Sequence, residues 1–200
     1  MSDGRVSIHD QEPLRRRRLA VLLRAILLFP HYVVIAIWTL LLVPVVPLSW
    51  LAAVFAGRVP SRLHRFLAAF LRYSGQVSAW LSLLSATYPD PLHTQEHPFR
   101  IEIPERGSQR RLLTLFRVPL AVPAFVLANA FGVILTASSI GAWFVSLVLG
   151  RTTRGLQELG TFCLRYQLET QAYLLLLTPS YPKLEPPPPP AEQLLIPGFE

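Results

Sequence analysis

Two long uncharged segments dominate the pattern of hydrophobic and polar positions. His31–Ala56 contains no Asp, Glu, Lys or Arg over 26 residues, and Ala124–Leu149 is equally free of charge. About 20 apolar residues are enough to cross the hydrocarbon core of a bilayer. Each segment therefore predicts a transmembrane helix, and Pro44 and Pro47 predict a kink in the first one.

A second pair of segments, Leu63–Ala86 and Leu156–Leu177, is long enough to cross but is interrupted by polar side chains. These stand at matching positions: Arg72 and Gln76 in the first segment, Arg165 and Glu169 in the second. The simplest prediction is two crossings per unit, four in all. The alternative lays these two segments flat on the membrane, which leaves one crossing per unit and an inverted repeat.

Basic, otherwise apolar segments precede both uncharged ones, at 14–29 and 110–122. We interpret both as amphipathic helices at the membrane interface, with arginines that face lipid headgroups. The predicted headgroup contacts are Arg15, Arg16, Arg17, Arg18, Arg24, Arg110, Arg111 and Arg117. Because one copy lies in the middle of the chain, we do not interpret the first copy as a cleaved leader peptide.

The chain repeats itself with a shift of 93 residues, which aligns Arg17–Asp90 with Arg110–Lys183 without a gap. Matched pairs include Arg24 and Arg117, Pro30 and Pro123, Trp50 and Trp143, Arg72 and Arg165, and Tyr88-Pro89 and Tyr181-Pro182. The same shift places 6–8 on 99–101. Because apolar and polar residues alternate over 99–103, each unit is predicted to open with a short strand, and the two strands could pair.

These patterns predict an all-α membrane protein built from a tandem repeat. The units are residues 4–90 and 109–183, joined by a linker over 91–108 and followed by a proline-rich tail over 184–200. An even number of crossings keeps both units in one orientation, related by a pseudo-two-fold axis along the membrane normal. The terminal arms and linker hold 12 Lys or Arg against five in the hairpin loops, which favours cytoplasmic termini.

Composition agrees with a membrane location. The chain is 52% hydrophobic and 16% charged, with a net charge of +7. Soluble domains carry about 25% charged residues. Because the arginines cluster at the ends of apolar runs, we expect partners in the lipid bilayer, namely anionic phospholipids, and no nucleic acid.

Arg72 and Arg165 are the main candidates for a functional site, because a charged residue within a membrane helix is costly and marks function by default. Glu169 can neutralise Arg165 one helical turn away, whereas Gln76 stands in that place for Arg72. The predicted anionic-ligand or lipid contacts are Arg72, Tyr73, Gln76, Arg165, Tyr166 and Glu169. The alternative is that both arginines reach the interface and only set helix depth.

Other polar features indicate less. Thr136, Ser138, Ser139 and Gly141 predict close helix approach, and Asn129 a hydrogen bond between helices. His93, Glu96 and His97 match a metalloprotease pattern. They lie in a short linker segment between two prolines with no evident third ligand, so we predict neither a metal nor another cofactor.

Several strings in the first unit carry a family resemblance: Leu22-Leu23-Arg24, Phe29-Pro30-His31, Phe55 to Pro60, Leu71-Arg72-Tyr73 and Tyr88-Pro89. Together they resemble an actinobacterial membrane family catalogued as domain of unknown function 4389. The resemblance covers both units, and the second departs from it at Thr152-Thr153. It implies the bacterial inner membrane and nothing catalytic.

The sequence leaves three hypotheses for function. The first is a non-enzymatic scaffold, accessory or lipid-interacting membrane subunit, since no catalytic constellation stands beside the strong membrane pattern. The second is a small transporter or channel component that uses the paired arginines, for which four helices would have to oligomerise. The third is a membrane metalloenzyme at His93, Glu96 and His97.

Overall fold

A computed structural model describes residues 7–9, 18–91, 100–103, 114–149 and 152–185 of the chain. Its elements follow in the order β1 (Ser7–His9), α1 (Arg18–Ala56), α2 (Ser61–Leu81), β2 (Arg100–Glu102), α4 (Arg117–Leu149) and α5 (Arg154–Leu174). Each repeat contributes one long helix, one shorter helix and one short strand, as the 93-residue shift predicts.

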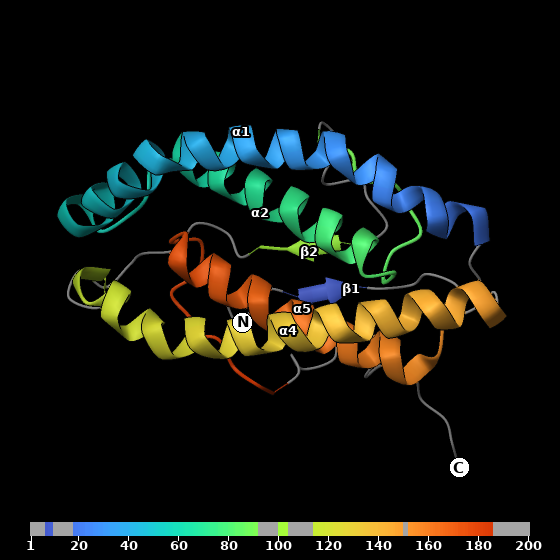
Figure 1. Cartoon of the computed structure of the whole chain (residues 1–200). Helices are drawn as coiled ribbons and strands as arrows, with labels where there is room; N and C mark the ends of the chain where they lie inside the picture. Colours follow the sequence, from blue (N-terminus) through green and yellow to red (C-terminus); the bar gives the residue numbers. More distant parts are fainter. Residues whose placement is uncertain (1–6, 10–17, 92–99, 104–113, 150–151, 186–200) are drawn as a thin grey trace, which may run out of the picture.

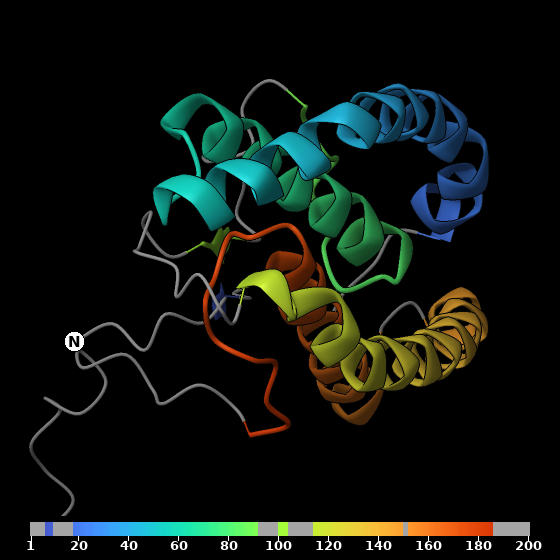
Figure 2. The same cartoon turned by 90° about the vertical axis from the view of Figure 1, so that its left-hand side faces the viewer.

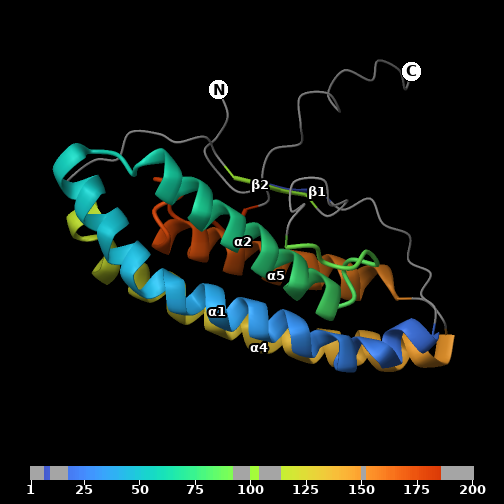
Figure 3. The same ribbon diagram turned by 90° about the horizontal axis from the view of Figure 1, so that it is seen from above.

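The long helices α1 and α4 run straight through positions where the sequence suggested an end. Helix α1 spans 39 residues and contains Pro30, Pro44 and Pro47, and α4 contains Pro123. The predicted boundary between an interfacial helix at 14–29 and a crossing helix at 31–56 was therefore wrong. A proline removes a single backbone donor, and a helix tolerates that loss by bending, as the bowed α1 in Figure 3 does. Of the predicted helix at 110–122, only residues 110–113 lie outside the described part. The helix that begins at Arg117 continues through Pro123 as α4, so the predicted boundary between 122 and 124 was wrong as well.

The shorter helices α2 and α5 each span 21 residues and end before the predicted limits at Ala86 and Leu177. The reason is a tight turn at the same repeat position in both. Leu83 and Leu176 adopt positive φ values of 60° and 62°. The amide of the next residue then reaches back to the last turn of the helix, Leu84 to Ala79 at 2.8 Å and Leu177 to Ala172 at 2.9 Å. This is a Schellman ending, which usually has glycine at the left-handed position.

The two strands form a ribbon, and the pseudo-two-fold axis that relates the repeats passes through its centre. They pair antiparallel, with Ile8 opposite Ile101, Ser7 opposite Glu102 and His9 opposite Arg100. Ile8 and Ile101 are themselves repeat equivalents, so a pseudo-two-fold axis passes between them. The predicted pairing of the two short strands is confirmed.

The same axis passes between α2 and α5. Gly75 and Leu168 are repeat equivalents, and a Cβ atom at Gly75 would lie 3.0 Å from Leu168 Cδ2. Glycine therefore lets the two helices approach closely at their crossing, directly beneath Ile101.

Helices α1 and α4 run in opposite directions on either side of this axis (Figure 1). Contacts at their ends agree: Trp50, near the end of α1, donates to the Thr114 carbonyl just before α4 at 2.9 Å. The β1–β2 ribbon lies on one side of the α2–α5 pair, and α1 and α4 lie on the other (Figure 3). The axis is therefore perpendicular to α1 and α4. The predicted combination of crossing helices with an axis along the membrane normal was wrong, because it requires α1 and α4 to be parallel.

Each repeat forms a helical hairpin, and the two hairpins lie one above the other when the molecule is seen end-on (Figure 2). They interlock through the two strained leucines. Leu83 packs into the second repeat against Ala142, Trp143, Leu147 and Leu156. Leu176 packs into the first repeat against Trp50, Ala53, Val59 and Leu63. We call Leu83 and Leu176 the exchanged leucines.

The outer surface of α1 and α4 is apolar. Of the large hydrophobic side chains that the described residues expose, eleven lie on α1, eleven on α4 and seven elsewhere. Leu27–Ala56 and Arg117–Val148 are long and apolar enough to cross a membrane, and only 11% and 22% of their most apolar stretches are buried. A core helix of a soluble protein would be mostly buried. Among the described helices, α2 and α5 do not meet the same measure.

Candidate functional site

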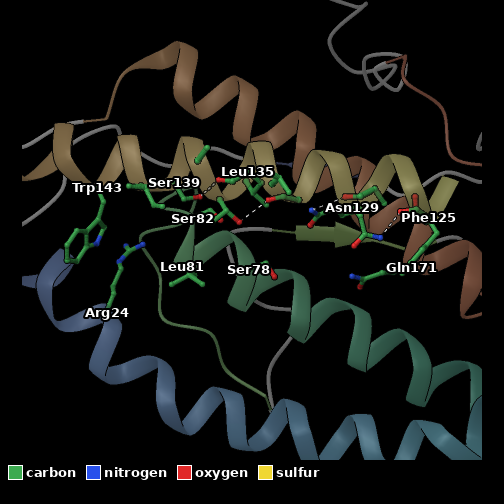
Figure 4. A pocket seen from close by; sticks show the side chains of 18 of the residues that line it. Arg24, Ser78, Leu81, Ser82, Phe125, Asn129, Leu135, Ser139, Trp143 and Gln171 are labelled. Carbon is green, nitrogen blue, oxygen red and sulfur yellow. Dashed lines mark hydrogen bonds between the residues drawn. The ribbon is translucent and has the colours of Figure 1, made fainter. Parts of the chain in front are cut away.

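A groove of about 1000 Å³ lies between α4 and the α2–α5 pair (Figure 4). We call it the central groove. Helix α4 lines one wall from Phe125 to Trp143, α5 contributes Gln167, Thr170, Gln171 and Leu174, and α2 contributes Ser78, Leu81 and Ser82. Arg24 of α1 and Trp143 close one end. The volume is in the range of pockets that hold ligands of small-molecule or lipid size.

The apolar part of the groove is continuous with the exposed surface of α4. Phe125, Val133 and Ile140 line the groove and are each more than half exposed. They recur at intervals of eight and seven residues, so they form one stripe along the helix. The groove therefore opens on the apolar side of the molecule, away from the β1–β2 ribbon.

The polar part of the groove is neutral apart from Arg24. Thr136, Ser139 and Asn129 donate to carbonyls of their own helix, at Gly132, Leu135 and Phe125. The oxygen atoms of these side chains keep lone pairs that can accept further hydrogen bonds. The predicted hydrogen bond from Asn129 to another helix is not the one formed, and Gly141 faces open space instead of a close neighbour.

Most of the polar side chains that line the groove come from the second repeat. Thr136, Ser139 and Asn129 stand where the first repeat has Val43, Val46 and Ala36, and Gln171 and Thr170 replace Ser78 and Val77. These differences were visible in the aligned repeats, but neutral residues at those depths gave no reason to group them. Only the crossing of α4 over α5 brings them to one cavity.

Gln167 illustrates how the wall of the groove is built. Its side-chain amide donates to the Ala128 carbonyl at 3.4 Å. It lies over Gly132, where a Cβ atom would come within 2.8 Å of Nε2. The first repeat has Thr39 and Ser74 at these two positions. A larger side chain on the short helix is thus matched by a smaller one on the long helix.

Arg24 and Arg117 are buried within the protein and do not face lipid headgroups. Arg24 donates to the carbonyls of Trp80 and Ser85, the second at 3.0 Å, and its guanidinium lies 5.0 Å from the Trp80 ring centre. Arg117 repeats this arrangement with the Thr178 carbonyl and the Tyr173 ring at 4.2 Å. The carbonyls at a helix end carry partial negative charge, which stabilises a buried cation.

This pair therefore corrects two of the predicted headgroup contacts, and each arginine clamps the end of the shorter helix in its own repeat. Arg15, Arg16, Arg17, Arg110 and Arg111 lie outside the described residues. Arg18 begins α1, and its side chain is also outside the described part.

Arg72 and Arg165 lie on the ribbon side of α2 and α5, away from the central groove. Arg72 Nε donates to the Ile101 carbonyl of β2 at 3.3 Å. Arg165 donates to the Leu184 carbonyl at 3.2 Å. The two arginines thus each hold a segment of chain that follows a helical hairpin, and each has its own carbonyl partner.

The predicted contact between Arg165 and Glu169 is present, with Arg165 Nε 3.9 Å from Glu169 Oε1. Glu169 Oε2 also accepts a hydrogen bond from the Lys183 amide at 3.1 Å. Gln76, its equivalent, is completely buried, as is Tyr73. The Tyr73 hydroxyl lies 2.7 Å from His31 Nδ1. Tyr166, the repeat equivalent of Tyr73, is buried against Phe131.

His31 is a residue that the sequence did not single out. Its buried ring lies between the rings of Tyr73, Trp80 and Tyr88, with the Tyr88 centre 4.6 Å away. The second repeat has Ala124 there. In the second repeat a cavity of about 660 Å³ lies beside Tyr166 and Tyr181, the equivalents of two tyrosines that pack against His31.

In the part of the chain that the structure describes, no three His, Cys, Asp or Glu residues gather where they could hold a metal ion. His93, Glu96 and His97 lie outside that part.

Comparison with known proteins gives one match. The family described as Domain of unknown function (DUF4389) matches residues 18–93 and again residues 111–184. The two matched regions correspond to the two repeats, and the family resemblance seen in the sequence is confirmed. No curated protein and no solved structure matches the chain.

Proposed function

Because the chain belongs to the DUF4389 family in two tandem copies, whose long helices are apolar enough to enter a membrane, we propose that it is a non-catalytic lipid-binding protein of the cell membrane. The observation that carries the proposal is the central groove. It joins an exposed apolar stripe to a cluster of neutral hydrogen-bonding groups. An amphiphile has the same two parts.

The lining indicates the class of lipid. The side chains of Ser78, Ser82 and Gln171 carry both donors and acceptors without net charge. Thr136 and Ser139, whose hydroxyls donate within α4, can still accept hydrogen bonds. The one cation among the described lining residues, Arg24, already donates to two carbonyls. The groove therefore suits ester carbonyls and hydroxyls, as in the glycerol region of a glycerolipid. Anionic headgroups suit the basic residues at the ends of the helices.

The alternative of a transporter or channel component loses its main support. It relied on Arg72 and Arg165 acting together inside the membrane. Both donate to carbonyls of chain segments on the ribbon side, Ile101 and Leu184. We keep the cytoplasmic location of the termini as part of the proposal, since basic residues favour that side.

Binding of a fluorescent diacylglycerol analogue to the detergent-purified chain tests the proposal. We expect saturable binding with about one lipid per chain. Thr136→Trp places an indole in the groove and should weaken binding at least about tenfold, a change of about 1.4 kcal/mol. Gly141→Trp is the matched control, because it lies on the same helix, outside the groove, and a side chain there meets open space.

Two results would overturn the proposal: binding that does not saturate in the parent chain, or equal affinity in the Thr136→Trp and Gly141→Trp variants. Retained helical circular dichroism in both variants shows that a loss of binding comes from the groove and not from unfolding.

A further inference from the structure

The repeat symmetry restricts how this molecule can sit in a bilayer. Helices α1 and α4 are antiparallel and the pseudo-two-fold axis is perpendicular to both (Figure 1). Two kinds of placement treat the repeats alike. In one the axis lies in the membrane plane, and α1 and α4 cross in opposite directions or lie in opposite leaflets. In the other the axis lies along the membrane normal, and both helices lie flat in one leaflet.

The position of the β1–β2 ribbon distinguishes these placements. The ribbon lies on the axis, beyond the α2–α5 pair and near the middle of the long helices (Figure 3). If α1 and α4 crossed the bilayer, the ribbon would lie near its middle depth. A two-stranded ribbon has two open edges, and hydrocarbon offers no partners for their amide and carbonyl groups. In the flat placement the ribbon is the part farthest from the hydrocarbon.

Charge leads to the same placement. Arg58, Arg62 and Arg65 are exposed at the turn between α1 and α2, and Arg154 is exposed at the start of α5, at the opposite end of the molecule (Figure 1). Crossing helices would put these two basic ends on opposite sides of the membrane. Basic residues are enriched on one side, the cytoplasmic one. In the flat placement both ends lie in the same headgroup layer.

The dimensions also agree. The hydrocarbon core is about 30 Å thick, so one leaflet offers about 15 Å. One helix with its side chains is about 10–12 Å across. A single layer of α1 and α4 therefore fits one leaflet, with its exposed apolar side chains in the hydrocarbon and the polar floor of the central groove near the headgroups.

We propose that α1 and α4 lie along the membrane plane within the cytoplasmic leaflet, with the pseudo-two-fold axis along the membrane normal and the β1–β2 ribbon in the cytoplasm. This inference rests on the membrane residence in the proposed function, but not on the lipid in the groove. Both long helices then lie in one leaflet, and neither α1 nor α4 crosses the bilayer.

Two equivalent positions test it. Arg65 and Glu158 are exposed, are related by the repeat, and lie at opposite ends of the molecule. Arg65→Cys and Glu158→Cys are labelled with a membrane-impermeant maleimide in inverted and in right-side-out vesicles. Native Cys163 is buried, so the parent chain sets the background. We expect both positions to react in inverted vesicles only. Labelling of the two positions from opposite sides would overturn the flat placement in favour of crossing.

Depth measurement gives an independent result. Phe29, Leu40 and Leu51 are exposed on α1 at intervals of 11 residues, hence on nearly one stripe of the helix. Spin labels there should show similar depths in the bilayer, whereas a crossing helix would bury the label at 40 far more deeply than the other two. Alkaline extraction separates the two proposals. A chain released into the supernatant refutes membrane residence itself, while a chain retained in the pellet with crossing depths refutes only the flat placement.

Discussion

The two repeats build the same frame but differ in what the frame encloses. Arg24 and Arg117 clamp equivalent helix ends over an aromatic ring, and Leu83 and Leu176 enter equivalent pockets of the opposite repeat. The long helices differ, because α4 carries Thr136, Ser138 and Ser139 where α1 carries valines, and Asn129 where α1 carries an alanine. Features that both repeats share hold the molecule together, whereas most of the polar side chains that line the groove occur only in the second repeat.

The exchanged leucines give the largest expected effect. Leu83→Ala and Leu176→Ala should each lower the free energy of unfolding by about 2–5 kcal/mol, because each empties a fully packed site. Glycine should be less harmful than alanine at these two positions by about 1–2 kcal/mol, since it adopts positive φ without strain. Thermal unfolding in detergent measures both.

Leu71 is the matched control for this comparison. It is as buried as Leu83 but lies inside helix α2. There glycine should be worse than alanine by about 1 kcal/mol. The shared frame would be contradicted if the order of glycine and alanine were the same at all three leucines, or if Leu83 and Leu176 responded differently.

Glu169 tests a difference between the repeats. Glu169→Gln gives the second repeat the residue type of the first, and it weakens both the contact to Arg165 and the bond to the Lys183 amide. Loss of a charge-assisted hydrogen bond costs about 1.5–3 kcal/mol. Because this bond holds the segment after α5, trypsin should cleave after Lys183 several-fold faster. Glu158→Gln, exposed on the same helix, should leave the cleavage rate unchanged. Equal rates in the two variants would show that Glu169 does not hold this segment.

The smallest effect on stability is expected in the groove. Thr136→Val with Ser139→Val gives α4 the valines that α1 carries, and thermal stability should change by less than about 0.5 kcal/mol. Affinity for the diacylglycerol analogue should nevertheless fall several-fold, because two hydrogen-bonding groups leave the lining. A stability loss as large as that of the leucine variants would mean that the hydroxyls serve the frame. Unchanged affinity would mean that the second repeat owes its groove to shape alone.

Individual residues show why part of this could be predicted. The 93-residue shift predicted the order of helices and the pairing of the short strands at Ile8 and Ile101, because equivalent sequences form equivalent local structures. The spacing of Arg165 and Glu169 predicted their contact, because residues four apart share a helix face. Pro30 was misleading, since a proline indicates a helix end only where the neighbouring turns cannot absorb the lost hydrogen bond.

Tertiary structure decided the rest. The sequence by itself determined two similar units, their apolar long helices and the family to which they belong, because periodicity and internal similarity are local properties. It could not determine the direction of one unit relative to the other, since a repeat fixes that two units are alike and not how an axis relates them. That choice set α1 and α4 in opposite directions and assembled the central groove from residues on four helices. The underlying reason is that packing joins side chains by their position in space. The crossing at Gly75 and Leu168, the paired strands and the exchanged leucines fix those positions.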